Sequence, residues 1–301
     1  MVKKHILAIL CAAVAIPSVT FAGVSSEGKE SKQLVEECKE SWISGDIGLN
    51  VVSQYISRGL IFENQGAILQ PYADLYAKLY EGDGFINKIS LNIGIWNSFQ
   101  SRHTDSGLVT GSGHATTGAW YEFDFTAGVA FTFAKYFTFT PSYYTFLSPN
   151  DGFDTFQGIN LNLAVDDSEW LGAFALHPHV TVLFELDNKA GSGPDEGIYY
   201  EVGIAPGLPA FGPLTVTFPI AAGFGSNDFY AEDGLGFISG GINAAYALTF
   251  VPEKWGAWTV SANATYYYLD SNLEDFNTGL DRVRRGTEHE VVFGGGLMVA
   301  F

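Results

Sequence analysis

The chain is 301 residues long, and its formal net charge of −18 argues against nucleic acid as a partner. Aromatic residues make up 15% of the chain, glycine occurs 35 times and charged residues reach only 16%, a composition unusual for a soluble enzyme. No apolar run after residue 22 is long enough for a transmembrane helix, so a membrane protein of this composition would cross the bilayer with strands.

The first 22 residues have the pattern of a cleavable signal peptide. Lys3 and Lys4 precede an apolar stretch over 6–16 that is too short to span a bilayer. Small residues occupy the −3 and −1 positions of a cleavage site after Ala22. We therefore predict export and exclude 1–22 from the fold, with an uncleaved anchor as the alternative. Cleavage would take the net charge from −18 to −20.

Cleavage would also leave Cys38 as the single cysteine, and a single cysteine makes no internal disulfide. Residues 23–41 around it are polar and charged, unlike the more apolar remainder of the chain. They predict a short N-terminal periplasmic segment, with a plug inside the folded domain as the alternative.

From Trp42 onward, apolar residues recur with a period of two. In the clearest segment, Phe123, Phe125, Phe131 and Phe133 alternate with polar or small residues. A soluble β-sandwich would bury this face against a second layer, whereas a membrane barrel turns it to lipid. We predict an all-β fold, a transmembrane antiparallel up-and-down β-barrel of about twelve strands over 42–301. The predicted strands are 46–60, 67–80, 88–98, 120–133, 136–147, 156–166, 174–187, 197–207, 213–224, 235–249, 257–269 and 289–301.

Five prolines fall inside these predicted strands, where a closed barrel offers no free edge to accommodate them. Some must therefore mark bulges or strand ends, and barrels of ten or fourteen strands stay as alternatives. The prolines are Pro71, Pro141, Pro178, Pro206 and Pro219.

The segment from Asn50 to Leu60 reads NVVSQYISRGL, and Gln65-Gly66 and a second alternating segment come after it. It resembles the opening of the TorF family of porins, whose first strand carries a serine–tyrosine–arginine–glycine pattern. The resemblance extends over about residues 46–80 and implies an outer-membrane barrel of small to medium size, with a porin function. The matching residues are Ser53, Tyr55, Arg58 and Gly59, with two residues between the tyrosine and the arginine.

The predicted connections alternate in length. Links after even-numbered strands are short, and longer polar loops follow most odd-numbered ones, with 61–66 as the short exception. Short turns are periplasmic in bacterial barrels, so we predict that the long loops are extracellular and both termini periplasmic. The longer loops are predicted at about 99–119, 148–155, 188–196, 225–234 and 270–288.

The last predicted strand places Phe293, Leu297, Val299 and Phe301 in one phase. This resembles the C-terminal signature by which bacterial outer-membrane proteins are recognised, so we predict an assembly signal for the barrel-assembly machinery. Aromatic residues near strand ends predict an interfacial girdle, with core packing as the alternative. They are Trp42, Tyr80, Trp96, Trp120, Tyr121, Tyr136, Trp170, Trp255 and Trp258.

Strand parity predicts a set of charged and titratable side chains on the luminal face. Two of them lie two apart on one strand, where they could chelate a metal, but a polar lumen wall is the simpler interpretation, so we predict no metal site and no cofactor. The arginine of the set either constricts the lumen or forms a structural salt bridge with a luminal carboxylate. The set is Arg58, Asp74, Lys78, Glu122, Asp124, His177, His179, Glu185 and Glu201.

Enzymatic chemistry has little support. His103, Asp105 and His114 share the 99–119 loop with several serines, but no nucleophile motif surrounds them. We predict no catalytic residues and no enzyme, with a barrel hydrolase as a remote alternative.

The basic cluster at 282–285 could contact lipopolysaccharide phosphates, lie over the pore mouth, or balance neighbouring glutamates. We predict an outer-membrane porin-like channel for passive diffusion of small hydrophilic solutes or ions, weakly cation-preferring because the luminal set is net negative. The alternative is a structural or adhesive barrel with a closed lumen. Predicted partners are outer-membrane lipid and lipopolysaccharide, the barrel-assembly machinery and small solutes.

Overall fold

The computed structural model describes residues 41–101, 119–271, 273, 277 and 288–301. The predicted signal peptide and nearly all of the 23–41 segment lie outside these residues, as do the histidines of the 99–119 loop and the 282–285 cluster. None of the helices in the described part is long and apolar enough to cross a membrane.

The strands are β1 (Ile43–Val52), β2 (Tyr55–Ser57), β3 (Leu60–Glu63), β4 (Ile68–Glu81), β5 (Ile86–Gln100), β6 (Trp120–Phe133), β7 (Phe137–Leu147), β8 (Phe156–Val165), β9 (His179–Asp187), β10 (Ile198–Ile204), β11 (Leu214–Thr217), β12 (Ile220–Gly225), β13 (Gly234–Ala247), β14 (Ala257–Leu269) and β15 (His289–Ala300). The helical turns are α2 (Ser168–Leu171), η2 (Gly172–Phe174), α3 (Asn227–Tyr230) and η3 (Glu253–Trp255).

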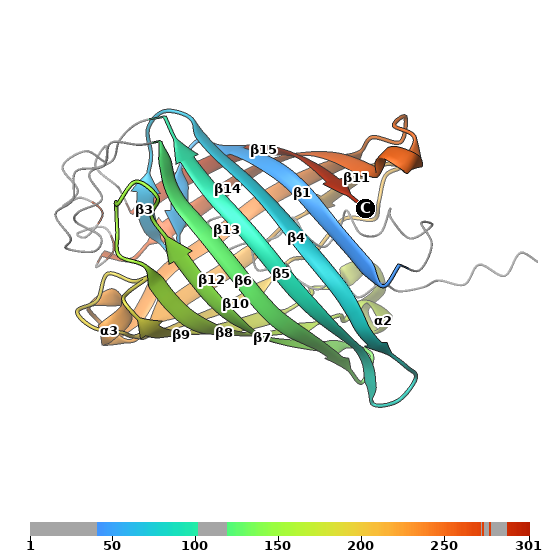
Figure 1. Ribbon diagram of the computed structural model, residues 1–301, viewed down its shortest axis with the longest axis horizontal. Coiled ribbons are helices and arrows are strands. Elements are labelled where there is room, and N and C mark those ends of the chain that lie inside the picture. Colours follow the sequence, from blue (N-terminus) through green and yellow to red (C-terminus); the bar gives the residue numbers. More distant parts are fainter. Residues whose placement is uncertain (1–40, 102–118, 272, 274–276, 278–287) are drawn as a thin grey trace, which may run out of the picture.

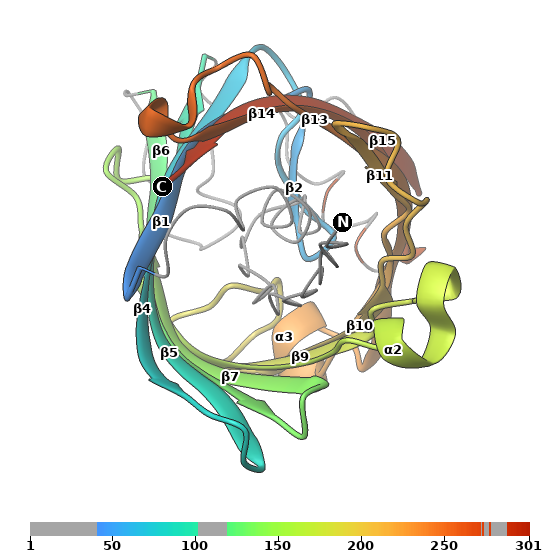
Figure 2. The same ribbon diagram turned by 90° about the vertical axis from the view of Figure 1, so that its right-hand side faces the viewer.

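Twelve strands close into one antiparallel barrel (Figure 1, Figure 2). From β1 the ring runs through β4, β5, β6, β7, β8, β9, β10, β12, β13 and β14 to β15, which pairs again with β1. A sheet closed on itself has no free edge and no second layer. The prediction of a twelve-stranded barrel is therefore confirmed, and the sandwich and the ten- and fourteen-stranded alternatives are wrong.

One wall strand is interrupted by a proline. β11 and β12 pair with β13 in an unchanged register on either side of Phe218-Pro219, so together they form one broken strand. Pro219 has no N–H to donate, but its carbonyl still accepts a hydrogen bond from the Gly241 backbone N at 2.9 Å. The wall stays continuous across this break.

The other four prolines are accommodated in two ways. Pro178 and Pro206 lie just outside β9 and β10, so these predicted strands are too long at one end. Pro71 and Pro141 lie within β4 and β7, at points where the pairing with one neighbouring strand is interrupted. Proline has no backbone N–H, so each of these positions must give up one hydrogen bond to a neighbouring strand.

The outer face of the wall is apolar. On β6, Phe123 and Phe125 point outward, whereas Glu122 and Asp124 are buried on the inner side, as the alternation predicts. Large apolar side chains are exposed on every side of the barrel. A continuous apolar exterior is typical of a barrel surrounded by lipid.

The predicted aromatic girdle is partly wrong. Trp120, Trp170 and Trp255 are exposed near strand ends, but Trp96 and Tyr121 are buried inside the barrel. Trp96 lies on the inner face of β5, and the register shift opposite Ser98 and Phe99 leaves Tyr121 unpaired in the ladder. A β-bulge of this kind re-aims a side chain, and here it turns Tyr121 inward.

The two ends of the barrel differ. At the end on the left of Figure 1, which we call the loop end, the connections are 53–67, 101–119, 148–155, 188–197, 226–233 and 270–288. The connections at the opposite end, the turn end, are 82–85, 134–136, 166–178, 205–213 and 248–256. The described chain starts and finishes at the turn end. The longest turn-end connection, 166–178, carries α2 and η2 outside the ring (Figure 2).

The first predicted strand, 46–60, is wrong in its second half. β1 ends at Val52, and β2 and β3 form a separate hairpin that lies inside the barrel (Figure 2). Tyr55 and Ile56 are neighbours of opposite parity and are 2% and 1% exposed, which a wall strand with one lipid-facing side does not provide. The first connection is therefore 53–67 instead of the short 61–66. We call residues 55–63 the luminal hairpin.

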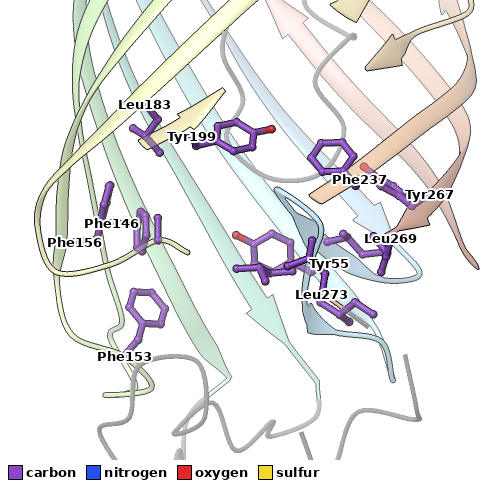
Figure 3. Packing of buried hydrophobic residues seen from close by; sticks show 14 of the residues in the cluster. Tyr55, Phe146, Phe153, Phe156, Leu183, Tyr199, Phe237, Tyr267, Leu269 and Leu273 are labelled. Carbon is purple, nitrogen blue, oxygen red and sulfur yellow. The ribbon is translucent and has the colours of Figure 1, made fainter. Parts of the chain in front are cut away.

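The luminal hairpin belongs to a cluster of buried apolar residues towards the loop end of the barrel (Figure 3). The cluster joins the hairpin to side chains from opposite sides of the wall, among them Phe146, Leu183, Phe237 and Leu269. We call it the loop-end core. Because it bridges most of the ring, it stabilises the hairpin inside the lumen by burial of apolar surface.

The turn-end half of the lumen has a different lining. Many of its inward side chains are small and polar and carry hydroxyls or amides, although Tyr76 of β4 also lies here. The lining of the lumen is thus mainly apolar towards the loop end and mainly polar towards the turn end. These polar side chains include Ser90, Thr138, Thr140, Ser142, Asn160, Asn162, Thr181 and Asn243.

Candidate functional site

The tip of the luminal hairpin is a two-residue turn formed by Arg58 and Gly59. Both have positive φ, 51° and 81°, as a type I′ hairpin turn requires. A Cβ added at Gly59 would lie 2.6 Å from the Leu273 side chain, so both the space and the backbone favour glycine. The turn fixes where the Arg58 side chain starts.

Three hydrogen bonds from other loop-end connections hold this turn. The Tyr230 hydroxyl of α3 donates to the Arg58 carbonyl at 2.7 Å. Asn277 donates to the Gly59 carbonyl at 3.2 Å and accepts from the Ile61 backbone N at 3.0 Å. The hairpin is therefore attached to two loop-end connections as well as to the core.

The base of the hairpin is held by a contact with β15 and by hydrogen bonds to the residues that follow β3. The Ser53 Oγ accepts from the Phe293 backbone N at 2.9 Å. Glu63, 2% exposed, accepts from the backbone N of Asn64 at 2.9 Å and of Gln65 at 2.8 Å. All four residues of the serine–tyrosine–arginine–glycine pattern thus lie in or beside the hairpin.

Glu122 and Asp124 face the hairpin from β6. The Tyr55 hydroxyl donates to Glu122 Oε2 at 2.8 Å, and the Tyr144 hydroxyl of β7 donates to Asp124 Oδ2 at 3.1 Å. Both carboxylates and both phenols are at least 96% buried. Buried carboxylates need such donors, because an uncompensated charge in this environment is costly.

The Arg58 side chain contacts residues of two wall strands, β7 and β10. Its Nη2 donates to the Tyr144 hydroxyl at 3.4 Å, and its guanidinium carbon lies 5.6 Å from the centroid of the Tyr144 ring and 6.0 Å from that of the Tyr199 ring. The Tyr199 hydroxyl donates in turn to Glu201 Oε2 at 2.6 Å. Arg58 also interacts electrostatically with Glu122 and Asp124.

The structure thus changes the prediction for Arg58. We expected it near the outer end of the first wall strand, but it is at the hairpin tip, because the strand has already ended. It does lie within the barrel, and both the structural salt bridge and the constriction stay predictions.

Glu185 organises a loop. Its carboxylate accepts from the backbone N of Ala190, of Gly191 at 3.0 Å and of Gly197 at 2.6 Å. These bonds fold the 188–197 connection back over the end of β9. Most of the hydrogen-bonding capacity of Glu185 is therefore used within the protein.

The remaining inward charges lie towards the turn end. Asp74 is on the inner face of β4, and its carboxylate lies over Gly94 of β5. Lys78 forms a 2.6 Å ion pair with Glu81. These groups contribute charge of both signs at a distance from the hairpin tip.

The two histidines do not share a strand. His179 begins β9, with Nε2 3.5 Å from Glu201 Oε1, but His177 lies in the 166–178 connection, 3.8 Å from Asp167 Oδ1. Pro178 separates them and ends the ladder, so the predicted pair on one face is wrong. Among the described residues, no three His, Cys, Asp or Glu side chains gather closely enough to hold a metal ion.

Asp167 fixes the backbone next to His177. Burial by itself raises the pKa of its carboxyl, but the backbone N–H groups of Leu176 and His177 donate to it and outweigh burial, so the pKa is held below its ordinary value.

The C-terminal residues close the wall. Phe293, Leu297 and Phe301 point outward, as their phase predicts. Phe301 exchanges two backbone hydrogen bonds with Gly45, of 2.9 and 3.0 Å, at the seam between β15 and β1. Whether these residues also act as an assembly signal stays a prediction.

Three tyrosines that contact Arg58, namely Tyr144, Tyr199 and Tyr230, were not singled out from the sequence. Tyr144 has inward parity, like Ser142 and Phe146, but it looks like any other aromatic residue in a strand. Tyr199 and Tyr230 are more than 140 residues away from their partner Arg58 in the chain. Parity can identify such residues as luminal, but their meeting point depends on the folded hairpin.

No known family profile and no curated protein matches the sequence, so the resemblance to the TorF family stays a prediction. Among solved structures, the chain is similar to the NanC porin at 11% identity and a TM-score of 0.46, covering 84% of this chain and 98% of that one. It is similar to an outer membrane channel from Pseudomonas putida F1 at 9% identity and a TM-score of 0.49, covering 86% and 95%. The outer membrane channel DcaP of Acinetobacter baumannii matches at 10% identity and a TM-score of 0.40, covering 86% and 96%. At these values we draw no conclusion from the likeness and rely on the chain's own residues.

Proposed function

We propose that this protein is an outer-membrane, porin-like channel for passive diffusion of small hydrophilic solutes or ions, and that the luminal hairpin closes it at the loop end. The observation that carries the proposal is the contrast between the two faces of one closed wall. The outer face is apolar around the whole ring, while the turn-end half of the lumen presents hydroxyls, amides and charges. A polar interior within an apolar exterior is typical of barrels that hold an aqueous path.

The hairpin gives the channel a closed state. Residues of the loop-end core come from strands around most of the ring, and in this proposal passage requires the hairpin to leave its place. Polar contacts of its tip include those of Arg58, Gly59 and Ile61 with Tyr230 and Asn277 and that of Arg58 with Tyr144. Movement of the hairpin would leave every pairing of the wall intact, because β2 and β3 form a sheet of their own.

The charge on the inner face favours cations. Asp74, Glu122, Asp124 and Glu201 lie within the barrel, and Asp46, which pairs with Asp74 on the neighbouring strand, adds to them. Arg58 and Lys78 offset part of this charge. A net-negative wall concentrates cations and repels anions, and the effect weakens as the Debye length falls from about 30 Å at 0.01 M salt to about 3 Å at 1 M.

Reversal potentials across a salt gradient test this proposal. We expect weak cation selectivity that is strongest in dilute salt and is reduced by Glu122→Gln combined with Asp124→Asn. Glu253→Gln, in an exposed turn-end residue, is the matched control and should leave selectivity unchanged. Anion selectivity would contradict the charge assignment.

A closed structural or adhesive barrel is the second candidate, and the loop-end core is the observation in its favour. A core of this kind would serve a rigid scaffold as well as a closed gate. Absence of conductance at every voltage, from protein that migrates as a folded barrel, would favour this candidate.

For orientation, we infer that the loop end is extracellular and the turn end periplasmic. The support is the distribution of connections, since the two longest, 101–119 and 270–288, are both at the loop end. Outer-membrane lipid and lipopolysaccharide would then surround the apolar wall, and the barrel-assembly machinery would meet the C-terminal strand.

A further inference from the structure

The group of side chains around Arg58 is built like a receptor for a cation. It has two layers, aromatic rings next to the guanidinium and carboxylates behind them. All of its members belong to wall strands. We call this group the arginine cage. It consists of Glu122 and Asp124 of β6, Tyr144 of β7, and Tyr199 and Glu201 of β10.

We propose that the arginine cage binds small organic cations with a guanidinium or ammonium group, and that Arg58 is a tethered competitor for the same place. This names the solute class of the channel and rests on the proposed function. A solute that occupies the cage would displace the Arg58 side chain and release the hairpin tip, so the permeating solute would itself favour the open state.

The aromatic layer is the first support. The guanidinium carbon of Arg58 lies 5.6 Å from the ring centroid of Tyr144 and 6.0 Å from that of Tyr199, within the range of cation–π attraction. Both rings are at least 97% buried, which strengthens such contacts. Cages of aromatic rings are a recurring way to bind ammonium and guanidinium groups.

The carboxylate layer is the second support. Each cage phenol donates its proton to a carboxylate, Tyr144 to Asp124 at 3.1 Å and Tyr199 to Glu201 at 2.6 Å. The Tyr144 oxygen then accepts from Arg58, so the negative charge behind the ring reinforces the contact with the cation. Glu122 and Asp124 both interact electrostatically with Arg58, and acidic groups near the cage disfavour anions.

Unsatisfied polar atoms give the third support. Within the part of the chain that the structure describes, neither the side-chain oxygen nor the side-chain nitrogen of Asn160 has a hydrogen-bond partner. Asn160 is fully buried and pairs with Ser142, two residues from Tyr144 on the inner face of β7. Buried groups of this kind are normally satisfied, and an N–H-bearing solute next to the cage would satisfy them.

The cage does not depend on the hairpin for its assembly. Its five residues lie on β6, β7 and β10, and the pairings of those strands do not involve β2 or β3. Removal of the Arg58 side chain should therefore leave the cage assembled but without the cation that occupies it. An added cation of the right shape should then fill it.

The test measures binding to the purified full-length barrel in detergent, by calorimetry, with butylguanidinium as the probe and the equally shaped but neutral butylurea as the control ligand. A tethered competitor acts at an effective concentration in the millimolar range, so Arg58→Ala should raise the apparent affinity for butylguanidinium by about tenfold or more over the unsubstituted protein. Lys254→Ala, which removes an exposed cation at the turn end, should have no effect. Glu122→Gln with Asp124→Asn, added to Arg58→Ala, should abolish the gain.

Equal affinity of the Arg58→Ala and unsubstituted proteins for butylguanidinium, or an equal gain for butylurea, would overturn the inference. Arg58→Gln, which keeps the length of the side chain and removes its charge, replaces Arg58→Ala if the latter does not fold, and should show the same direction of change. Because binding is measured without conduction, a protein that binds but never conducts would refute the channel alone, and one that conducts without the gain in affinity would refute the cage alone.

Discussion

Tyr55→Phe tests directly whether the hairpin closes the lumen. The Tyr55 side chain is 2% exposed, and its hydroxyl donates to Glu122 Oε2 at 2.8 Å. The substitution keeps the ring, which stacks on Phe62 with centroids 5.0 Å apart, and removes only the hydrogen bond. A buried acceptor that loses its donor costs about 1–3 kcal/mol.

That cost applies to the closed state alone if the hairpin leaves its place when the channel opens. The ratio of closed to open time should then fall by about 5- to 150-fold. Single-channel recording in planar bilayers measures this ratio. Tyr200→Phe is the matched control, since Tyr200 lies on the outer face of β10 at 41% exposure, and it should behave as the unsubstituted protein does. A Tyr55→Phe ratio equal to that of the control would refute the assignment of the hairpin as the gate.

Three other expectations concern assembly, orientation and pH. Deletion of Phe301 should lower the amount of folded, heat-modifiable barrel in the outer membrane and leave export intact, and a normal amount would contradict the assembly signal. Cysteines placed in 102–118 or 278–287 should react with a reagent outside intact cells and one at Ala134 should not, whereas the reverse would invert the orientation. Because the pKa of Asp167 is lowered in the folded state, its stabilisation is present at neutral pH and is lost as pH falls below about 4. The unfolding temperatures of the unsubstituted protein and Asp167→Asn should therefore converge in acid, and a constant difference would count against this role.

The barrel could be predicted from the sequence because lipid imposes the period of two on its outer face. The predicted strands 120–133 and 257–269 have the same bounds as β6 and β14. Even the broken strand was found, because the alternation resumes in the same phase after Pro219. Outward parity holds wherever one face meets lipid, whatever the inner face contains.

The hairpin could not be predicted in this way. Residues 55–63 are in contact with protein on both faces, so no alternation marks where the wall ends. The segment continued an apolar strand, and Arg58-Gly59 gave the only sign of a turn. Strand parity therefore placed Arg58 in the wall. His177 was likewise placed on a wall strand because the predicted strand 174–187 begins before β9 does.

The cage was beyond sequence reasoning for another reason. Glu122 and Asp124 were identified as luminal from their phase on β6, but their partners Tyr55 and Tyr144 come from distant parts of the chain. Which side chain meets which depends on how far the hairpin reaches into the lumen. That depth is set by the loop-end core, which no local pattern encodes.

Conductance with and without the hairpin is the most direct test of the proposed gate. Val52 and Ile68 are paired neighbours at the loop end, so a linker of about four glycine and serine residues can replace 54–66 without strain on the wall. We expect the unsubstituted protein to be closed for most of the time, with brief cation-preferring openings, and the linker variant to be open continuously. If the linker variant folds as a heat-modifiable barrel and conducts no more than the unsubstituted protein, the luminal hairpin is not the gate of a channel.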